Sequence, residues 1–196
     1  MMENFLLITL LSEKYKMDEL KNGTLRTDRL ELTAATFDHI HAEMESPEHL
    51  VRLLRTQVEP GWPPGEYDRD AQEFFGCRLK EGGASVVGWY VWYAVRREEE
   101  NQPSMLVGTG GYFGPPNEGG EVEIGFSIMP SARKDGYATE MARALVSNAF
   151  YDIRVHKVIA RTTSDNMASV KVLTKSGFRY IRRDPSGNDV FEILRS

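Results

Sequence analysis

The spacing of hydrophobic positions changes abruptly within residues 121–151. From Val122 to Ile128 every second residue is apolar, which is the period of a strand with one buried face. Pro130 has no backbone N–H to donate to a neighbouring strand, so we expect the strand to end before it. From 136 to 151 the apolar residues recur at steps of three and one, which places them on one face of a helix. The sequence therefore predicts a strand, a short loop and a helix in succession.

The same patterns divide the rest of the chain into strands and helices. Strands are expected at 30–34, 87–95, 105–113, 157–162, 178–183 and 189–194, and helices at 36–45, 48–56, 67–79 and 166–176. Thr36 is the expected cap of the first helix, and Pro47 its end. The segment 60–65, rich in proline and glycine, cannot form regular structure. Together these elements predict a single α/β domain, a mixed sheet with helices on its faces.

Residues 1–24 are expected to precede this domain, which we place at 25–196. The apolar run 5–11 is too short to span a membrane, and no basic residue precedes it as in a secretory signal. Met17 opens a more ordinary start. Two interpretations of the first sixteen residues remain open, an extension outside the fold and a helix docked on it.

The amino-acid composition argues against some classes of function, including nucleic-acid binding and metal binding. With 196 residues, 41% of them hydrophobic, the chain has enough apolar material for one core. The formal charge of −5 and the absence of basic runs argue against a nucleic-acid partner. The lone Cys77 excludes an internal disulfide and fits a reducing, cytoplasmic compartment. No metal site is expected, because His39 and His41 would face different sides of a helix and are better placed on the surface.

The oligomeric state is open between a monomer and a homodimer. The aromatic strand segment 89–93 could turn one face to the core and the other to a partner.

The loop between the predicted strand and helix is basic and contains a glycine. Arg133, Lys134 and Gly136 lie there, just before the helix N-terminus, where unpaired N–H groups and the helix dipole favour an anion such as phosphate. A tight turn that needs a glycine is an equally simple interpretation. No Gly-Lys-Ser/Thr ends the loop, which excludes a P-loop. The dinucleotide fingerprint also fails, because Phe113 stands where its last glycine should be.

Three motifs in a fixed order carry a family resemblance. They are 25–32 (LRTDRLEL), 133–138 (RKDGYA) and 166–178, which opens NMASVKVL and closes KSGF. Together they resemble the GNAT N-acetyltransferases, and in particular the branch of the ribosomal-protein N-terminal acetyltransferases. The resemblance implies a three-layer α/β/α sandwich whose mixed, mostly antiparallel sheet is splayed in the middle. It also implies transfer of an acetyl group from acetyl-CoA to a primary amine, either a protein N-terminus or a small amine.

The resemblance further implies a coenzyme A site on the strand, the loop and both helices. The expected contacts are Ser127, Ile128, Met129, Arg133, Lys134, Asp135, Gly136, Tyr137, Ala138, Thr139, Asn166, Ser169 and Lys175. The loop amides and Arg133 would hold the pyrophosphate, and free strand backbone would hold the pantetheine arm. Lys134 and Asp135 depart from the family pattern, and a carboxylate beside pyrophosphate is unfavourable unless it points to solvent. Lys175 could attract a phosphate or form a solvated face.

Two residues are candidates for acid–base chemistry by the same resemblance. Glu123 is the expected general base, with Glu121 as a second choice, and burial would suit this role by raising the pKa of the carboxyl group. The alternative is that Glu123 orders the neighbouring backbone or binds the acceptor amine. Ser169 is the expected acid for the leaving thiolate, because Leu173 occupies the position at which some relatives carry a tyrosine. A serine bonded to its own helix backbone is the alternative.

The acceptor site is the least determined part. Trp62 and Tyr67 are candidate pocket walls together with Glu123, although aromatic residues in a proline-rich loop also pack over a core. Cys77 has no histidine close in sequence, which favours direct attack in a ternary complex over an acyl-enzyme. Two other classes stay open: a non-catalytic protein that senses coenzyme A or binds a partner, and another enzyme with a phosphate ligand.

Overall fold

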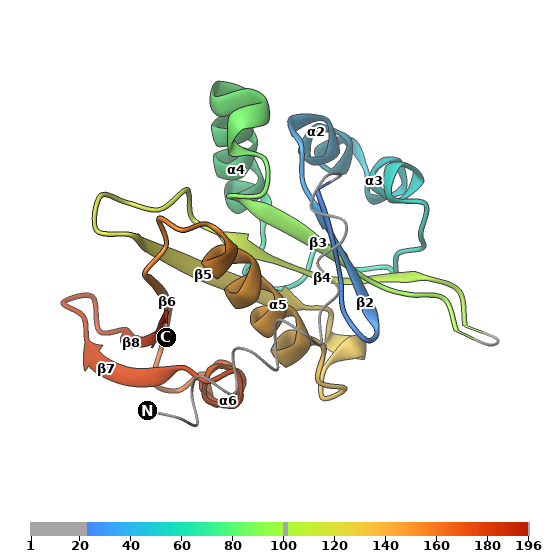
Figure 1. Ribbon diagram of the computed structural model, residues 1–196. Coiled ribbons are helices and arrows are strands. Elements are labelled where there is room, and N and C mark those ends of the chain that lie inside the picture. Colours follow the sequence, from blue (N-terminus) through green and yellow to red (C-terminus); the bar gives the residue numbers. More distant parts are fainter. Residues whose placement is uncertain (1–22, 100–101, 196) are drawn as a thin grey trace.

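The computed structural model describes residues 23–99 and 102–195, so the predictions for residues 1–22 lie outside the described part. Its centre is an eight-stranded sheet of order β1-β2-β3-β4-β5-β6-β8-β7 (Figure 1). The strands are β1 Thr24–Arg26, β2 Leu30–Ala34, β3 Val91–Arg96, β4 Met105–Tyr112, β5 Glu121–Ile128, β6 Lys157–Thr162, β7 Arg179–Arg183 and β8 Asp189–Leu194. The helices are α2 Phe37–Glu45, α3 Pro47–Leu54, α4 Arg69–Gly82, α5 Tyr137–Tyr151 and α6 Met167–Lys175, with short 3-10 turns η2 Gly83–Val86 and η3 Pro130–Ala132.

Two hydrophobic clusters lie on opposite faces of the sheet. Trp92 packs with α5 in one cluster, and Tyr93 packs with residues of α2, α3 and α4 in the other. Figure 1 shows α2, α3 and α4 together on one side and α5 on the other. Because both faces of β3 are buried within the chain, the idea that the aromatic segment 89–93 turns one face to a partner is wrong. The predicted three-layer α/β/α arrangement is confirmed.

Local side-chain bonds set the helix boundaries. Thr36 caps α2 by accepting from the His39 backbone N–H, while the His39 ring bonds back to the Thr36 backbone N–H. His39 is half-buried in this capping box and is therefore not the free surface histidine that we expected; burial lowers its pKa. Pro47 takes the first position of α3, where a missing N–H costs nothing. Asp68 caps α4, which therefore starts after Tyr67.

One strand prediction needed correction. The strand expected at 87–95 begins only at Val91, because Gly88 has a positive φ of 89° and turns the chain just before it. The opening motif 25–32 spans parts of β1 and β2. Its middle forms a turn closed by the Thr27 N–H donating to the Leu30 carbonyl at 2.9 Å, so that β1 and β2 pair antiparallel. The later start of β3 comes from a turn inside an apolar run.

The sheet separates between β5 and β6. β4 pairs with β5 from Ile124 to Ile128, whereas the parallel pairing of β5 with β6 covers only Glu121 to Glu123. β6 continues along β8 to Thr162. The predicted splay in the middle of the sheet is therefore confirmed, and it opens toward the C-terminal end of β5.

Candidate functional site

The backbone of β5 directs polar groups into the splay. The Phe113 N–H donates to the Glu123 carbonyl at 3.1 Å, and the Met129 N–H donates to the Val107 carbonyl at 2.9 Å. In an antiparallel pair, only every second residue of a strand bonds to the partner strand. Between Glu123 and Met129 the odd-numbered residues therefore bond to β4, and the even-numbered residues turn their backbone groups away from it. Phe126 and Ile128 therefore present their backbone groups to the splay.

Of the three strand residues expected to contact coenzyme A, Ser127, Ile128 and Met129, only Ile128 has backbone groups free of β4. Ile128 faces the splay, and its carbonyl accepts from Arg133 Nε at 3.1 Å. The Met129 amide is already bonded to β4, and the Ser127 hydroxyl donates to the Pro64 carbonyl at 3.1 Å. Phe126 was missed, although strand alternation alone, with β4 as the known partner, identifies it.

The loop after β5 turns its backbone toward the helix start. Lys134 and Gly136 have positive φ values of 73° and 88°, and α5 begins at Tyr137. Gly136 is the N-cap and offers no side chain to the first N–H groups of α5. These amides, including those of Ala138 and Thr139, form the anion-binding feature of a helix N-terminus. The Asp135 side chain is exposed, which is the condition under which a carboxylate is tolerated in this loop.

Arg29, in the turn between β1 and β2, is hydrogen-bonded to this loop. Its guanidinium donates to the Asp135 carbonyl at 2.8 Å and to Glu140 Oε2 at 2.8 Å, and it lies 4.5 Å from the centre of the Tyr137 ring. Glu140 also accepts from the Thr27 hydroxyl at 2.5 Å. The charge of Glu140, in the first turn of α5, is therefore matched by Arg29. Sequence reasoning did not assign these residues a role, although Arg29 lies in the opening motif.

Glu123 and Glu121 each form an ion pair with a basic side chain on β6. Glu123 forms an ion pair with Arg161, and its side chain is 24% exposed. Lys157 Nζ lies 2.6 Å from Glu121 Oε2. The Arg161 guanidinium also lies 3.5 Å from Asp184. This arrangement fits the interpretation in which Glu123 orders the neighbouring strands; its role as a base stays a prediction.

The start of α6 places Ser169 at an accessible position. Asn166 is the cap, because its Oδ1 accepts from the Ser169 N–H at 3.1 Å. The Ser169 hydroxyl is half-buried and makes no hydrogen bond to the described residues, so the alternative interpretation, a bond back to its own helix, is wrong. Leu173 is buried in the core and Lys175 is exposed.

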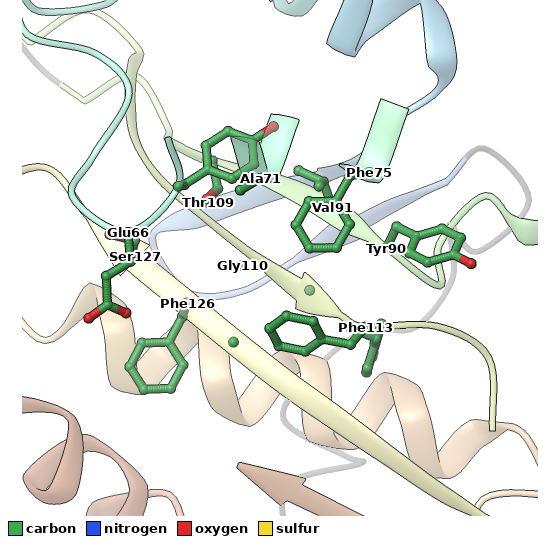
Figure 2. Close-up of a pocket in the computed structure, with 14 residues that line it drawn as sticks. Glu66, Ala71, Phe75, Tyr90, Val91, Thr109, Gly110, Phe113, Phe126 and Ser127 are labelled. Carbon is green, nitrogen blue, oxygen red and sulfur yellow. The ribbon is translucent and has the colours of Figure 1, made fainter. Parts of the chain in front are cut away.

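A cavity of about 180 Å³ lies beside the same part of β5 (Figure 2). It lies between the sheet and α4, with the segment before α4 along its edge. Its lining consists of Glu66, Tyr67, Ala71, Phe75, Tyr90, Val91, Thr109, Gly110, Gly111, Tyr112, Phe113, Gly125, Phe126 and Ser127. Because Gly125, Phe126 and Ser127 belong to the splayed part of β5, the cavity and the splay share one strand segment.

A buried carboxylate anchors the segment next to this cavity. Glu43 accepts from Trp62 Nε1 at 2.6 Å, from the Tyr67 hydroxyl at 2.9 Å and from the Tyr93 hydroxyl at 2.6 Å. Burial raises the pKa of Glu43, and the three donors oppose that rise. Tyr67 lines the cavity, whereas Trp62 does not and packs in the core. The sequence does hold a signal for Glu43, which follows Ile40 by three residues on the buried face of α2.

The described residues hold neither a membrane-spanning helix nor a cluster of metal ligands. None of their helices is both long and apolar enough to cross a bilayer. In the same residues no three His, Cys, Asp or Glu side chains gather as metal ligands would. Cys77 is exposed on α4 and is free.

Comparison with known proteins gives relatives over most of the chain. The family model described as "Acetyltransferase (GNAT) domain" matches residues 29–179. The N-acetyltransferase YjdG of Bacillus subtilis, itself uncharacterized, is 29% identical over 154 residues, which are 79% of this chain and 88% of that protein.

Solved structures share the fold. One from Vibrio cholerae, whose name proposes a ribosomal-protein-serine acetyltransferase, has a TM-score of 0.60 at 16% identity, covering 88% of this chain and 97% of that one. The aminoglycoside acetyltransferase AAC(6')-Ib, in complex with ribostamycin and coenzyme A, has a TM-score of 0.57 at 20% identity, covering 86% and 94%. With the family model spanning more than half of the sequence, the chain belongs to the GNAT family of acetyltransferases.

Proposed function

We propose that this acetyltransferase moves the acetyl group of acetyl-CoA to a primary amine by direct attack in a ternary complex. One observation carries the proposal: the splay of β5, the amide-rich loop at the start of α5 and a cavity lie along one strand. A donor and an acceptor can therefore meet at β5. Placing two reactants side by side can supply several kcal/mol of the barrier reduction.

The donor side uses the splay and the loop. We assign the coenzyme pyrophosphate to the backbone amides from Gly136 to Thr139, with Arg133 and Lys134 as cations. The backbone of Phe126 and Ile128 is assigned to the pantetheine arm. Asn166 and Ser169, at the start of α6 just after the separated end of β6, complete this side, with Lys175 at the other end of α6. The family members solved with coenzyme A support this assignment.

The reaction needs two proton movements. The neutral amine nitrogen attacks the thioester carbonyl carbon, a C–N bond forms, and the C–S bond breaks with its electron pair leaving on sulfur. The nitrogen loses one proton, to Glu123 through water or to water alone. The Ser169 hydroxyl gives a proton to the departing thiolate and regains one from water. The products are an N-acetylated amine and the free thiol of coenzyme A.

A second candidate function has one observation in its favour. The ion pair with Arg161 engages the carboxylate that the base role requires, which suits a protein of this fold that binds coenzyme A without catalysis. Turnover separates the two candidates. If Glu123→Gln and Ser169→Ala leave the release of coenzyme A at the same low level as the unmodified protein with every amine, the non-catalytic candidate is preferred.

Thermal unfolding with acetyl-CoA, coenzyme A or ATP tests the donor assignment. A ligand present at about a hundred times its dissociation constant stabilises a protein by roughly 2.7 kcal/mol. We expect both forms of coenzyme A to raise the melting temperature, and ATP not to. Stabilisation by ATP alone would instead support another phosphate-ligand enzyme. An isolable acetylated enzyme would contradict direct attack.

We also propose the cytoplasm as the working compartment, because the free and exposed Cys77 fits a reducing environment. A protein N-terminus and a small amine both remain acceptors under this proposal. The names of the structural neighbours point in both directions, one to a ribosomal protein and one to an aminoglycoside.

A further inference from the structure

The cavity beneath α4 has a floor made largely of glycine. Gly111 on β4 is paired with Gly125 on β5, and Gly110 adjoins them. A Cβ at Gly111 would lie 1.8 Å from the Tyr90 carbonyl oxygen, and one at Gly125 would lie 3.2 Å from the Phe113 ring. Only the side chain missing at Gly125 would enter the cavity, because a Cβ at Gly110 would meet Met141 and Leu145 of α5 on the other face of the sheet.

Aromatic rings form the walls of this space. The Phe75 ring centre lies 6.5 Å from that of Tyr67, 6.1 Å from that of Tyr90 and 5.9 Å from that of Phe113. Phe113 is 54% exposed, so a molecule from solvent can reach its ring. Such walls favour a flat apolar group, because aromatic pairs gain free energy beyond the area that they bury.

The lining of the cavity carries a charged side chain at one end only. Glu66 is the sole charged residue of the lining, and it is exposed. Figure 2 shows Glu66 next to Ser127, and Phe113 and Tyr90 at the opposite end. The end with the carboxylate is therefore the end beside Ser127, nearest the C-terminal end of β5, toward which the splay opens.

The size of the cavity limits the group that it can hold. Its volume is about 180 Å³. An apolar cavity of about 150 Å³ in another protein holds one benzene molecule. An aminoglycoside has several sugar rings and several ammonium groups, for which this lining offers neither the volume nor the carboxylates.

Building on the proposed function, we propose that the acceptor is a primary amine joined by a short linker to a single aromatic ring. The ring lies among Phe75, Tyr90 and Phe113, over the glycine floor, and the ammonium group first meets Glu66. The amine then loses a proton and reacts at β5. A free arylalkylamine and a peptide with an N-terminal phenylalanine both carry this chemistry.

The test compares kcat/KM at saturating acetyl-CoA for five acceptors: 2-phenylethylamine, ethylamine, kanamycin, and short peptides that begin with phenylalanine or serine. We expect 2-phenylethylamine to exceed ethylamine and kanamycin by at least about tenfold, because burial of an aromatic side chain is worth about 1.5–3 kcal/mol. A preference for the phenylalanine peptide over both the serine peptide and 2-phenylethylamine would identify a peptide as the source of the ring.

Two variants with matched controls locate the effect. Gly125→Ala should lower the ratio of kcat/KM for 2-phenylethylamine over ethylamine by about tenfold, the usual effect of one methyl group in an apolar pocket. Gly119→Ala, in the turn before β5 and outside the cavity, should keep the ratio. Glu66→Gln should raise KM for 2-phenylethylamine about two- to fivefold, the scale of an exposed ion pair, while Glu118→Gln should not.

The outcomes separate this inference from the proposed function. If acetyl-CoA stabilises the protein and kanamycin or ethylamine reacts as well as 2-phenylethylamine, the inference is overturned and the function stands. Stabilisation by acetyl-CoA with no turnover of any of the five acceptors also overturns it. If acetyl-CoA does not bind, the proposed function fails, and the inference with it.

Discussion

The buried carboxylate of Glu43 gives a prediction that can be worked from its contacts. It accepts hydrogen bonds from Trp62, Tyr67 and Tyr93 at 2.6, 2.9 and 2.6 Å. Glu43→Leu would leave these donors buried without that acceptor. At about 1–3 kcal/mol for each unsatisfied group, the free energy of unfolding should fall by roughly 3 kcal/mol or more. That is a large part of a typical total of about 5–15 kcal/mol.

Glu43→Gln removes the charge of the side chain and keeps its size, so it tests the effect of the charge alone. Burial raises the pKa of Glu43 in the folded protein, so the folded state holds this proton more tightly than the unfolded chain does. The resulting stability is fully present below the unfolded pKa, near 4.3, and is lost as pH rises through the folded pKa. Glutamine does not titrate. The stability of the variant minus that of the wild type should therefore increase as pH rises from about 4.

The assay is urea unfolding at a series of pH values, with Glu81→Gln as the control. Glu81 is 65% exposed and pairs with Arg78 on the surface, so its replacement should change stability by less than about 1 kcal/mol. A difference between Glu43→Gln and wild type that stays flat with pH, or decreases, would refute the reasoning. It would mean that the three donors outweigh burial and lower the pKa of Glu43.

Three further predictions concern the loop and α6. Arg29→Met should destabilise the protein by about 1–3 kcal/mol, because the mostly buried Glu140 loses its cation; adding Glu140→Gln should restore part of this in a double-mutant cycle. Gly136→Ala should cost about 1 kcal/mol, since Gly136 has a φ of 88°, and isothermal titration should show weaker acetyl-CoA binding. Ser169→Ala should lower kcat about a hundredfold, measured as the release of coenzyme A at saturating acetyl-CoA. Equal activity of Ser169→Ala and wild type would remove the acid role.

Local patterns predicted much of the fold. The strand at 121–128 and the helix that follows it match β5 and α5, because each has a clear period and an end marked by proline or glycine. The start of β3 was misplaced, since Val87 and Trp89 are apolar for another reason: they pack against the core from a turn. Hydrophobicity alone does not distinguish a strand residue from a buried turn residue.

The site was less predictable, because it depends on contacts between distant segments. The motifs located the loop, yet Arg29 reaches it from more than a hundred positions away. The partner of Glu123 lies on β6, and only the parallel pairing of β5 with β6 brings Arg161 near it. The cavity arises where the glycines of two strands meet α4, a coincidence that no single stretch of sequence encodes.

The release of coenzyme A thiol, measured with and without an amine at saturating acetyl-CoA, tests the central claim most directly. Acetyl transfer in a ternary complex predicts release that depends on the amine and equals the amount of N-acetylated product. Binding of acetyl-CoA without release that depends on any amine would contradict the claim, and would leave a protein that binds coenzyme A and does no chemistry.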